Sequence, residues 1–185
     1  MSNKKEKTTF TSMAFDIVSI MATAVVAVGL CFVCLFRTIQ VSGSSMFPTL
    51  YDGEQIILQS VYTKPQNGDV VVTAQPNASP FIEDVLVKRI IATEGQTVKL
   101  ERNDDGYTFS VYVDDVKLDE PYINEPVERT LDYWKPVTVP EGYVYVMGDN
   151  RNDSSDSRDD DIGMIREEYI MGKVVYSISS NKAVK

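Results

Sequence analysis

One serine of this chain lies in a segment that suits nucleophilic chemistry. Ser45 belongs to the run Val41-Ser42-Gly43-Ser44-Ser45-Met46-Phe47-Pro48-Thr49-Leu50. A serine hydroxyl at its ordinary pKa is a weak nucleophile and needs a neighbouring base, most often a histidine, to take its proton. The sequence contains no histidine, so any base must be of another type.

A lysine can serve as that base when burial among apolar groups lowers its pKa toward the working pH. Lys88 lies in the apolar stretch from Val85 to Ile91, so Ser45 and Lys88 form the candidate catalytic dyad. Because neighbours on a strand point to opposite faces, we expect that Lys88 and Arg89 are not both buried. In the alternative interpretation, the basic pair is an exposed strand edge and the serine segment is an ordinary cap or turn.

A third polar segment, Gly148 to Arg158, follows a run typical of a β-strand. Its hydroxyls and opposite charges suit a hydrogen-bonded loop that holds other groups in place. Calcium binding is disfavoured, because the spacing lacks the glycine and terminal glutamate of an EF-hand loop, whereas a solvated acidic loop remains an alternative. The candidate supporting residues of this segment are Asp149, Asn150, Ser154, Asp156 and Arg158.

An uncharged apolar segment from Ile17 to Phe36 precedes all three segments. It is about as long as the roughly 20 residues that span a hydrocarbon core, and longer than the apolar region of a cleaved signal peptide, about 7–15 residues. We therefore expect a single transmembrane helix that stays attached. Lysines at positions 4, 5 and 7 place residues 1–16 in the cytoplasm by the positive-inside rule, and residues 37–185 outside the cell membrane.

The exported part is acidic. Removing the three lysines and two acids that precede Arg37 from the totals of 18 and 27 leaves 15 basic and 25 acidic residues, a net charge of about −10. This charge argues against nucleic acid as a partner and against binding to anionic lipid headgroups. Cys31 and Cys34 lie within the apolar span and are interpreted as packing residues. With no histidine or cysteine beyond the span, we expect no zinc site and no cofactor.

Short β-type runs separated by turn residues dominate the exported part, which predicts a mainly β, antiparallel domain. Turn residues indicate a hairpin within Asp104 to Asp115, and Tyr122 to Pro140 is interpreted as an irregular insertion. The predicted strands are Gln55 to Leu58, Asp69 to Thr73, Val85 to Ile91, Thr97 to Leu100, Phe109 to Val113, Gly142 to Met147 and Lys173 to Ile178.

The three segments, in this order, resemble those of the bacterial type I signal peptidases. Ser45 to Leu50 matches that family's S-M-x-P-T-L motif, Lys88 to Gly95 its lysine segment, and Gly148 to Arg158 its G-D-N-R-x-x-S-x-D-S-R motif. Smaller matches occur at Gly68 to Val71 and Glu120 to Tyr122. The compact chain with one anchor is similar to the Gram-positive type.

This resemblance implies a serine endopeptidase that removes signal peptides from secreted preproteins at the lipid bilayer, after an A-x-A-like site. By the resemblance, Ser45 is the nucleophile, Lys88 the general base and Ser154 the residue that orients the lysine amine, while Asp156 and Arg158 form a supporting ion pair. The family fold is an antiparallel β catalytic core with a variable second β region, here about residues 100–140. Met46 and Leu50 are expected to line a shallow apolar pocket.

The sequence departs from the family pattern in places. Some relatives carry a serine hydroxyl where this chain has Gly43, so the second oxyanion donor would be Ser44 or a backbone group. Ala92 to Gln96 differs from the usual turn after the lysine. Two other functions stay open: processing dedicated to pilus or surface-protein assembly, and a non-catalytic assembly chaperone, which should lack a residue of the dyad. Self-cleaving repressors of related fold lack such an anchor.

Overall fold

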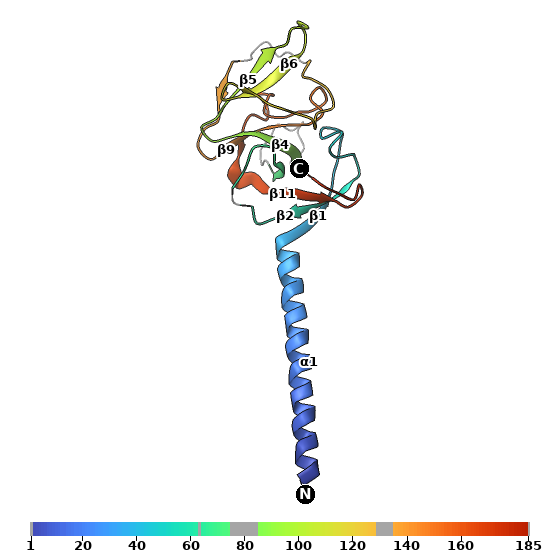
Figure 1. The fold of residues 1–185 in the computed structure, drawn as a ribbon. Helices are drawn as coiled ribbons and strands as arrows, with labels where there is room; N and C mark the ends of the chain where they lie inside the picture. Colours follow the sequence, from blue (N-terminus) through green and yellow to red (C-terminus); the bar gives the residue numbers. More distant parts are fainter. Residues whose placement is uncertain (1, 63, 75–84, 129–134, 185) are drawn as a thin grey trace. The chain divides into compact units, whose positions relative to one another are not determined.

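The chain forms two compact units, Met1–Phe36 and Arg37–Lys185. This computed structural model describes residues 2–62, 64–74, 85–128 and 135–184, with side chains from Ser12 onward. The first unit is the helix α1, Ser2–Leu35, of which Ser12–Leu35 is long and apolar enough to cross a membrane (Figure 1). The helix ends one residue before the predicted span does. Phe36 begins a strand instead, because the β-branched pair Thr38 and Ile39 follows it.

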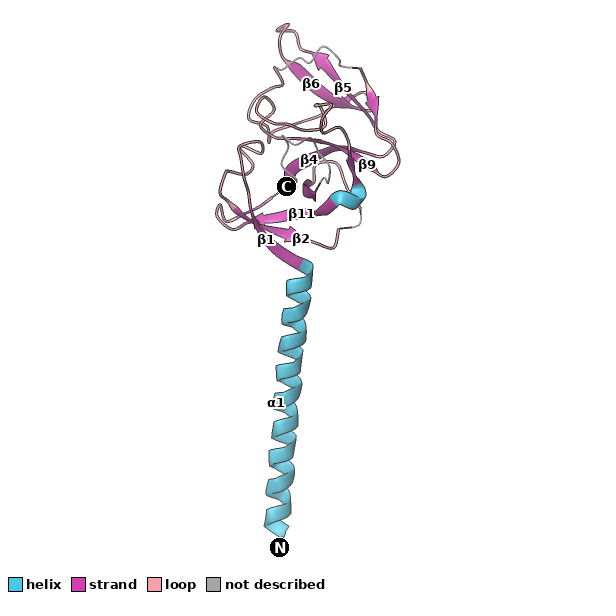
Figure 2. Ribbon diagram, turned by 180° about the vertical axis from the view of Figure 1, so that it is seen from behind, coloured by secondary structure: helices cyan, strands magenta, loops and turns pink. Residues whose placement is uncertain are grey.

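The larger sheet of the second unit has eight strands within the described part of the chain. It runs in the order β1-β2-β11-β3-β4-β9-β10, with β12 paired to β11, and the pairs with a printed register are antiparallel. Its strands are β1 (Phe36–Gln40), β2 (Gln55–Gln59), β3 (Val70–Ala74), β4 (Val85–Thr93), β9 (Tyr143–Met147), β10 (Ile165–Arg166), β11 (Ile170–Ser177) and β12 (Lys182–Ala183). The short 3-10 helix Glu167–Tyr169 directly precedes β11 (Figure 2).

The central strands of this sheet are buried on both faces. Val70 and Val72 of β3 pack into one apolar cluster, whereas Val71 between them packs into another. In β4, both Lys88 and Arg89 are buried, at 3% and 1% exposure. The expectation that only one of them is buried is therefore wrong, because both faces of this strand are covered and alternation alone does not place either residue in water.

A smaller sheet forms the second β region. Its order is β7-β6-β5-β8, with β5 at Thr97–Arg102, β6 at Phe109–Val113, β7 at Val116–Lys117 and β8 at Val137–Thr138. The predicted hairpin within Asp104 to Asp115 resolves into two turns, one joining β5 to β6 and one joining β6 to β7. The predicted insertion Tyr122 to Pro140 contains β8, and its residues 129–134 lie outside the described part.

Each of the predicted strands occurs, within a few residues of its expected bounds, which confirms the mainly β fold. One apolar cluster joins the smaller sheet to β4 and β9 and contains Phe109, Val111 and Met147. A second cluster lies beneath the serine segment and contains Met46, Leu50 and Ile56. The serine segment is therefore anchored by its own apolar side chains.

Candidate active site

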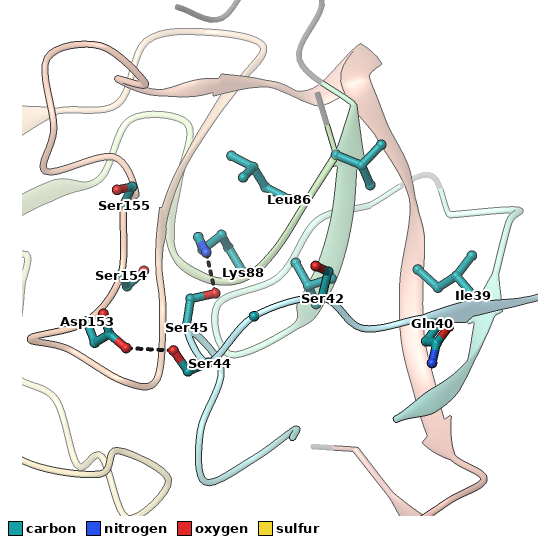
Figure 3. Close-up of a pocket in the computed structure, with 13 residues that line it drawn as sticks. Ile39, Gln40, Ser42, Ser44, Ser45, Leu86, Lys88, Asp153, Ser154 and Ser155 are labelled. Carbon is teal, nitrogen blue, oxygen red and sulfur yellow. Dashed lines mark hydrogen bonds between the residues drawn. The ribbon is translucent and has the colours of Figure 1, made fainter. Parts of the chain in front are cut away.

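Ser45 and Lys88 lie in contact, although 43 residues separate them in the chain. Ser45 is on the segment that follows β1, and Lys88 projects from the middle of β4. The Lys88 Nζ donates a hydrogen bond of 2.6 Å to Ser45 Oγ (Figure 3). Because the lysine side chain is almost completely buried, this amine and this hydroxyl can exchange a proton with little competition from water.

The backbone around Ser45 is held from two sides. Gly43 adopts a φ of 87°, a conformation that favours glycine, and its N–H donates to Asp52 Oδ1 at 2.8 Å. From the other side, the Asn150 N–H donates to the Ser45 carbonyl at 3.0 Å, and the Asn150 side chain donates to the Ser44 carbonyl at 3.2 Å. Asn150 therefore fixes the main chain of Ser44 and Ser45.

Gly148 permits a close approach between two segments of the site. A Cβ on this residue would collide with the Ser154 side chain and would lie 2.5 Å from the Ser45 carbonyl oxygen. The Gly148 N–H also donates to Asp156 Oδ2 at 2.9 Å. Only a residue without a side chain fits between the serine segment and Ser154.

Asp156 and Arg158 form the ion pair that the resemblance implies. Arg158 Nε donates to Asp156 Oδ1 and its second terminal nitrogen to Oδ2, each at 2.7 Å. Burial alone would raise the pKa of Asp156, but the paired Arg158 guanidinium and the hydrogen bonds from Gly148 and Ser154 outweigh it and lower that pKa. The same pairing raises the pKa of Arg158, against the lowering effect of burial.

Ser154 belongs to the same network. It is 8% exposed, lies on the wall of the cavity that contains Ser45 and Lys88, and donates through Oγ to Asp156 Oδ2 at 2.8 Å. The Ser154 hydroxyl therefore donates its proton to Asp156. The lone pairs of the Ser154 oxygen can then accept hydrogen bonds from other donors. A lysine amine is such a donor.

Asp149 pairs with Arg89, whose importance the sequence interpretation missed. Arg89 Nε and its second terminal nitrogen donate to the two oxygens of Asp149, at 2.8 and 2.7 Å, and both side chains are buried. Thr49 also donates to Asp149, and the Arg89 guanidinium lies 3.9 Å from the centre of the Tyr122 ring. Thus Arg89 joins β4 to the segment after β9 and also stabilises the end of the serine segment.

Arg151 and Glu120 form a third buried pair, with contacts of 3.1 and 2.6 Å. Arg151 Nε also donates to the Gly148 carbonyl at 3.0 Å. Neither residue was assigned a role from the sequence, although Glu120 lies in one of the short matches to the family and Arg151 lies in the matched segment Gly148 to Arg158. Asp149 and Asp156 of this segment each pair with an arginine, so their negative charges are balanced without a metal ion.

A cavity of about 440 Å³ opens beside the dyad. Its wall combines apolar side chains from β1 and from the start of β4 with polar residues of the two loops (Figure 3). Met46 and Leu50 do not belong to the wall: at 1% and 0% exposure they are part of the core beneath it, so their expected role is wrong for this cavity. The lining residues are Ile39, Gln40, Ser42, Gly43, Ser44, Ser45, Val85, Leu86, Val87, Lys88, Asp153, Ser154 and Ser155.

The sequence pattern of the family described as "Signal peptidase, peptidase S26" matches residues 14–178. This match covers most of the chain, including α1 from Ala14 onward and both sheets except β12. The chain therefore belongs to the signal peptidase family and is a serine peptidase, which makes it a hydrolase.

Two Bacillus signal peptidases agree with this assignment. Signal peptidase I T of Bacillus subtilis (strain 168) is 36% identical over 149 residues, which cover 75% of this chain and 71% of the relative. A signal peptidase I of Bacillus amyloliquefaciens is 33% identical over 182 residues, with 93% and 91% covered. Thylakoidal processing peptidase 1 of Arabidopsis thaliana is 34% identical, but this chain spans only 40% of its length. A signal peptidase I structure from Enterococcus faecalis V583 is 29% identical over 60% of this chain and 97% of that one, with a TM-score of 0.43.

Proposed function

We propose that this chain cleaves signal peptides from exported preproteins after an A-x-A-like site, with Ser45 as nucleophile and Lys88 as general base. Ser45 Oγ attacks the scissile carbonyl carbon while its proton passes to a neutral Lys88 amine. The lysine then gives this proton to the departing amine, and the peptide bond breaks. Water, deprotonated by the same lysine, hydrolyses the acyl-enzyme and restores both residues. The 2.6 Å contact between a buried lysine and Ser45 is the observation that carries this proposal.

The oxyanion that forms during the attack needs hydrogen-bond donors. The backbone N–H of Ser45 is a suitable one, since it donates to no acceptor in the described parts of the chain. Ser44 is a poor second donor, because its single hydroxyl proton is already donated to Asp153 Oδ2 at 2.6 Å. A second donor must therefore come from elsewhere, or Ser44 must leave Asp153 when substrate binds.

The cavity suits the small residues of an A-x-A site. Ile39 and Leu86 offer apolar surface near the dyad, and both lie on its wall. Small apolar side chains such as those of alanine can be placed against this apolar surface without leaving a polar group unpaired. A signal peptide would keep its apolar segment in the bilayer while its end reaches the cavity.

The test is cleavage of a preprotein with an A-x-A site by the detergent-solubilised full chain. We expect wild type to cut after the second alanine, and Ser45→Ala and Lys88→Ala to lose at least about a thousandfold in kcat, since proton transfer alone contributes about 10²–10⁴-fold. Lys173→Ala is the matched control, because Lys173 is outside the cavity wall. An inert wild type, tested on several preproteins, would favour the non-catalytic assembly function. Full activity of Lys88→Ala would require another base.

A further inference from the structure

Asp153 differs from the other carboxylates of its segment. Asp149 and Asp156 are completely buried and each accepts two hydrogen bonds from an arginine. Asp153 is exposed and lies on the cavity wall, where its Oδ2 accepts the hydrogen bond from Ser44. Among the described residues it forms no ion pair. Its negative charge therefore faces the cavity.

Among the residues that the structure describes, two ionisable side chains lie on the cavity wall, those of Lys88 and Asp153. In the mechanism above, Lys88 must be neutral at the moment when it takes the serine proton. Asp153 then supplies the charge that an arriving substrate meets. Apolar walls, here Ile39 and Leu86, strengthen such a field, and the acidic surface of the domain adds to it rather than opposing it.

Asp153 also lies close to the bond that would be cut. Its carboxylate accepts a hydrogen bond from Ser44, the residue directly before the proposed nucleophile (Figure 3). A charged substrate side chain next to the scissile bond would therefore meet Asp153 more closely than one several residues away.

From this geometry we infer that Asp153 is a specificity-determining residue, which favours substrates with lysine or arginine next to the scissile bond and disfavours aspartate or glutamate there. The relevant substrate positions are the middle residue of A-x-A and the first residue after the cut. This inference rests on the proposed function. Asp153 acts on substrate choice, and Ser45 and Lys88 still perform the reaction.

The experiment compares peptides that differ in one residue. Each carries an A-x-A site with Lys, Gln or Glu at the middle position, or at the first position after the cut, and kcat/KM is measured at low ionic strength. An exposed charge pair changes an equilibrium by a factor of up to about five. Asp153 attracts a lysine and repels a glutamate in the substrate. We therefore expect kcat/KM of wild type to be about five to ten times higher for the Lys peptide than for the Glu peptide at one of these positions.

Three variants test whether this ratio depends on the charge of Asp153 or on its hydrogen bond with Ser44. Asp153→Asn keeps an acceptor for Ser44 but removes the charge, so its ratio should fall to about one. Ser44→Ala breaks the hydrogen bond but keeps the charge, so its ratio should persist even if its overall rate falls. Asp160→Asn removes an exposed acid outside the cavity wall and should leave the ratio unchanged. High salt should lower the wild-type ratio, which tests the charge without any substitution.

Two results would overturn the inference: equal kcat/KM values for Lys and Glu peptides in wild type, or a ratio that survives both Asp153→Asn and high salt. Failure of the proposed function looks different. In that case wild type cleaves none of the peptides, including those with the neutral Gln.

Discussion

At the scale of single residues, Asp156 couples the stability of the site to pH. Its pKa in the folded protein is lowered, whereas in the unfolded chain an aspartate has a pKa of about 3.9. The stabilisation is therefore complete above the unfolded pKa, and it is lost as the pH falls from about 5 through the folded pKa, because the unfolded state gains a proton first.

We expect Asp156→Asn to lower the free energy of unfolding by about 3–5 kcal/mol at pH 7, since it leaves the buried Arg158 without its partner. That difference from wild type should shrink steadily between about pH 5 and pH 3. Denaturant titrations of the solubilised chain at several pH values measure it. The exposed control Asp160→Asn should show almost no difference at any pH, and a pH-independent difference for Asp156→Asn would refute the coupling.

Gly148 gives a second prediction at this scale. In Gly148→Ala, the new methyl group must push the Ser45 carbonyl away, because that atom belongs to the backbone and cannot rotate aside. A displacement of about 1 Å at a nucleophile can cost about a hundredfold in rate. We therefore expect kcat to fall by about that factor while much of the fold persists.

The matched control is Gly106→Ala. Gly106 has a positive φ of 79°, unlike Gly148, but open space around its Cβ position, so alanine there strains the backbone without a collision. It should cost about 1 kcal/mol of stability and little activity. Equal activity losses in the two variants would show that the close approach at Gly148 does not matter.

At the scale of elements, the Arg89–Asp149 pair connects β4 to the segment after β9. Removing one partner of a buried pair leaves an uncompensated charge, which costs about 3–5 kcal/mol. We expect Arg89→Ala to lower the free energy of unfolding by this amount, as measured by denaturant titration of the solubilised chain. Activity should fall as well, because Lys88 is the neighbouring residue on the same strand.

An exposed pair provides the control. Arg166 and Glu168 lie 2.9 Å apart, but their side chains are 53% and 63% exposed. Arg166→Ala should change stability by less than about 1 kcal/mol, as is usual for such pairs. If the two substitutions cost the same, burial is not what makes the Arg89–Asp149 pair important.

Elements were largely predictable from the sequence, because β-branched runs and turn residues act locally. Which side chains of each strand are buried was not predictable. Lys88 and Arg89 are both buried because other segments pack on both faces of β4. Those segments are distant in the chain, so the alternation of residues within β4 does not predict this packing. Met46 and Leu50 were misplaced for the same reason: an apolar residue beside a nucleophile can face the pocket or the core, and both face the core.

At the scale of the whole molecule, we propose that the N-terminus of α1 lies in the cytoplasm and the β-rich unit outside. The basic residues before the span favour this orientation. Protease added to intact protoplasts should degrade a tag at the C-terminus and spare a tag at the N-terminus. Permeabilised cells, in which both tags become accessible, are the control. If the C-terminal tag is protected in intact protoplasts, the proposed orientation is wrong.

The site as a whole was predictable to the extent that motifs name its members. Ser45, Lys88 and the segment Gly148 to Arg158 could be singled out from residue types and order. The pairings of Arg89, Glu120 and Arg151 could not be predicted, although all three lie in the matched segments, because each residue gains its partner only when distant segments meet. Asp153 was part of a quoted motif, yet its exposure on the cavity wall is a property of the folded chain alone.

The hydrogen bonds from Asn150 to the serine segment carry a consequence for biogenesis. A polypeptide crossing a membrane from its N-terminal end delivers Ser45 early, Lys88 later and Asn150 later still. Until the third segment arrives, the carbonyls of Ser44 and Ser45 lack the hydrogen bonds that Asn150 donates, although the contact of Gly43 with Asp52 can already form. The hydrogen-bonded geometry of the serine segment is therefore completed late, after the last of the three segments has emerged.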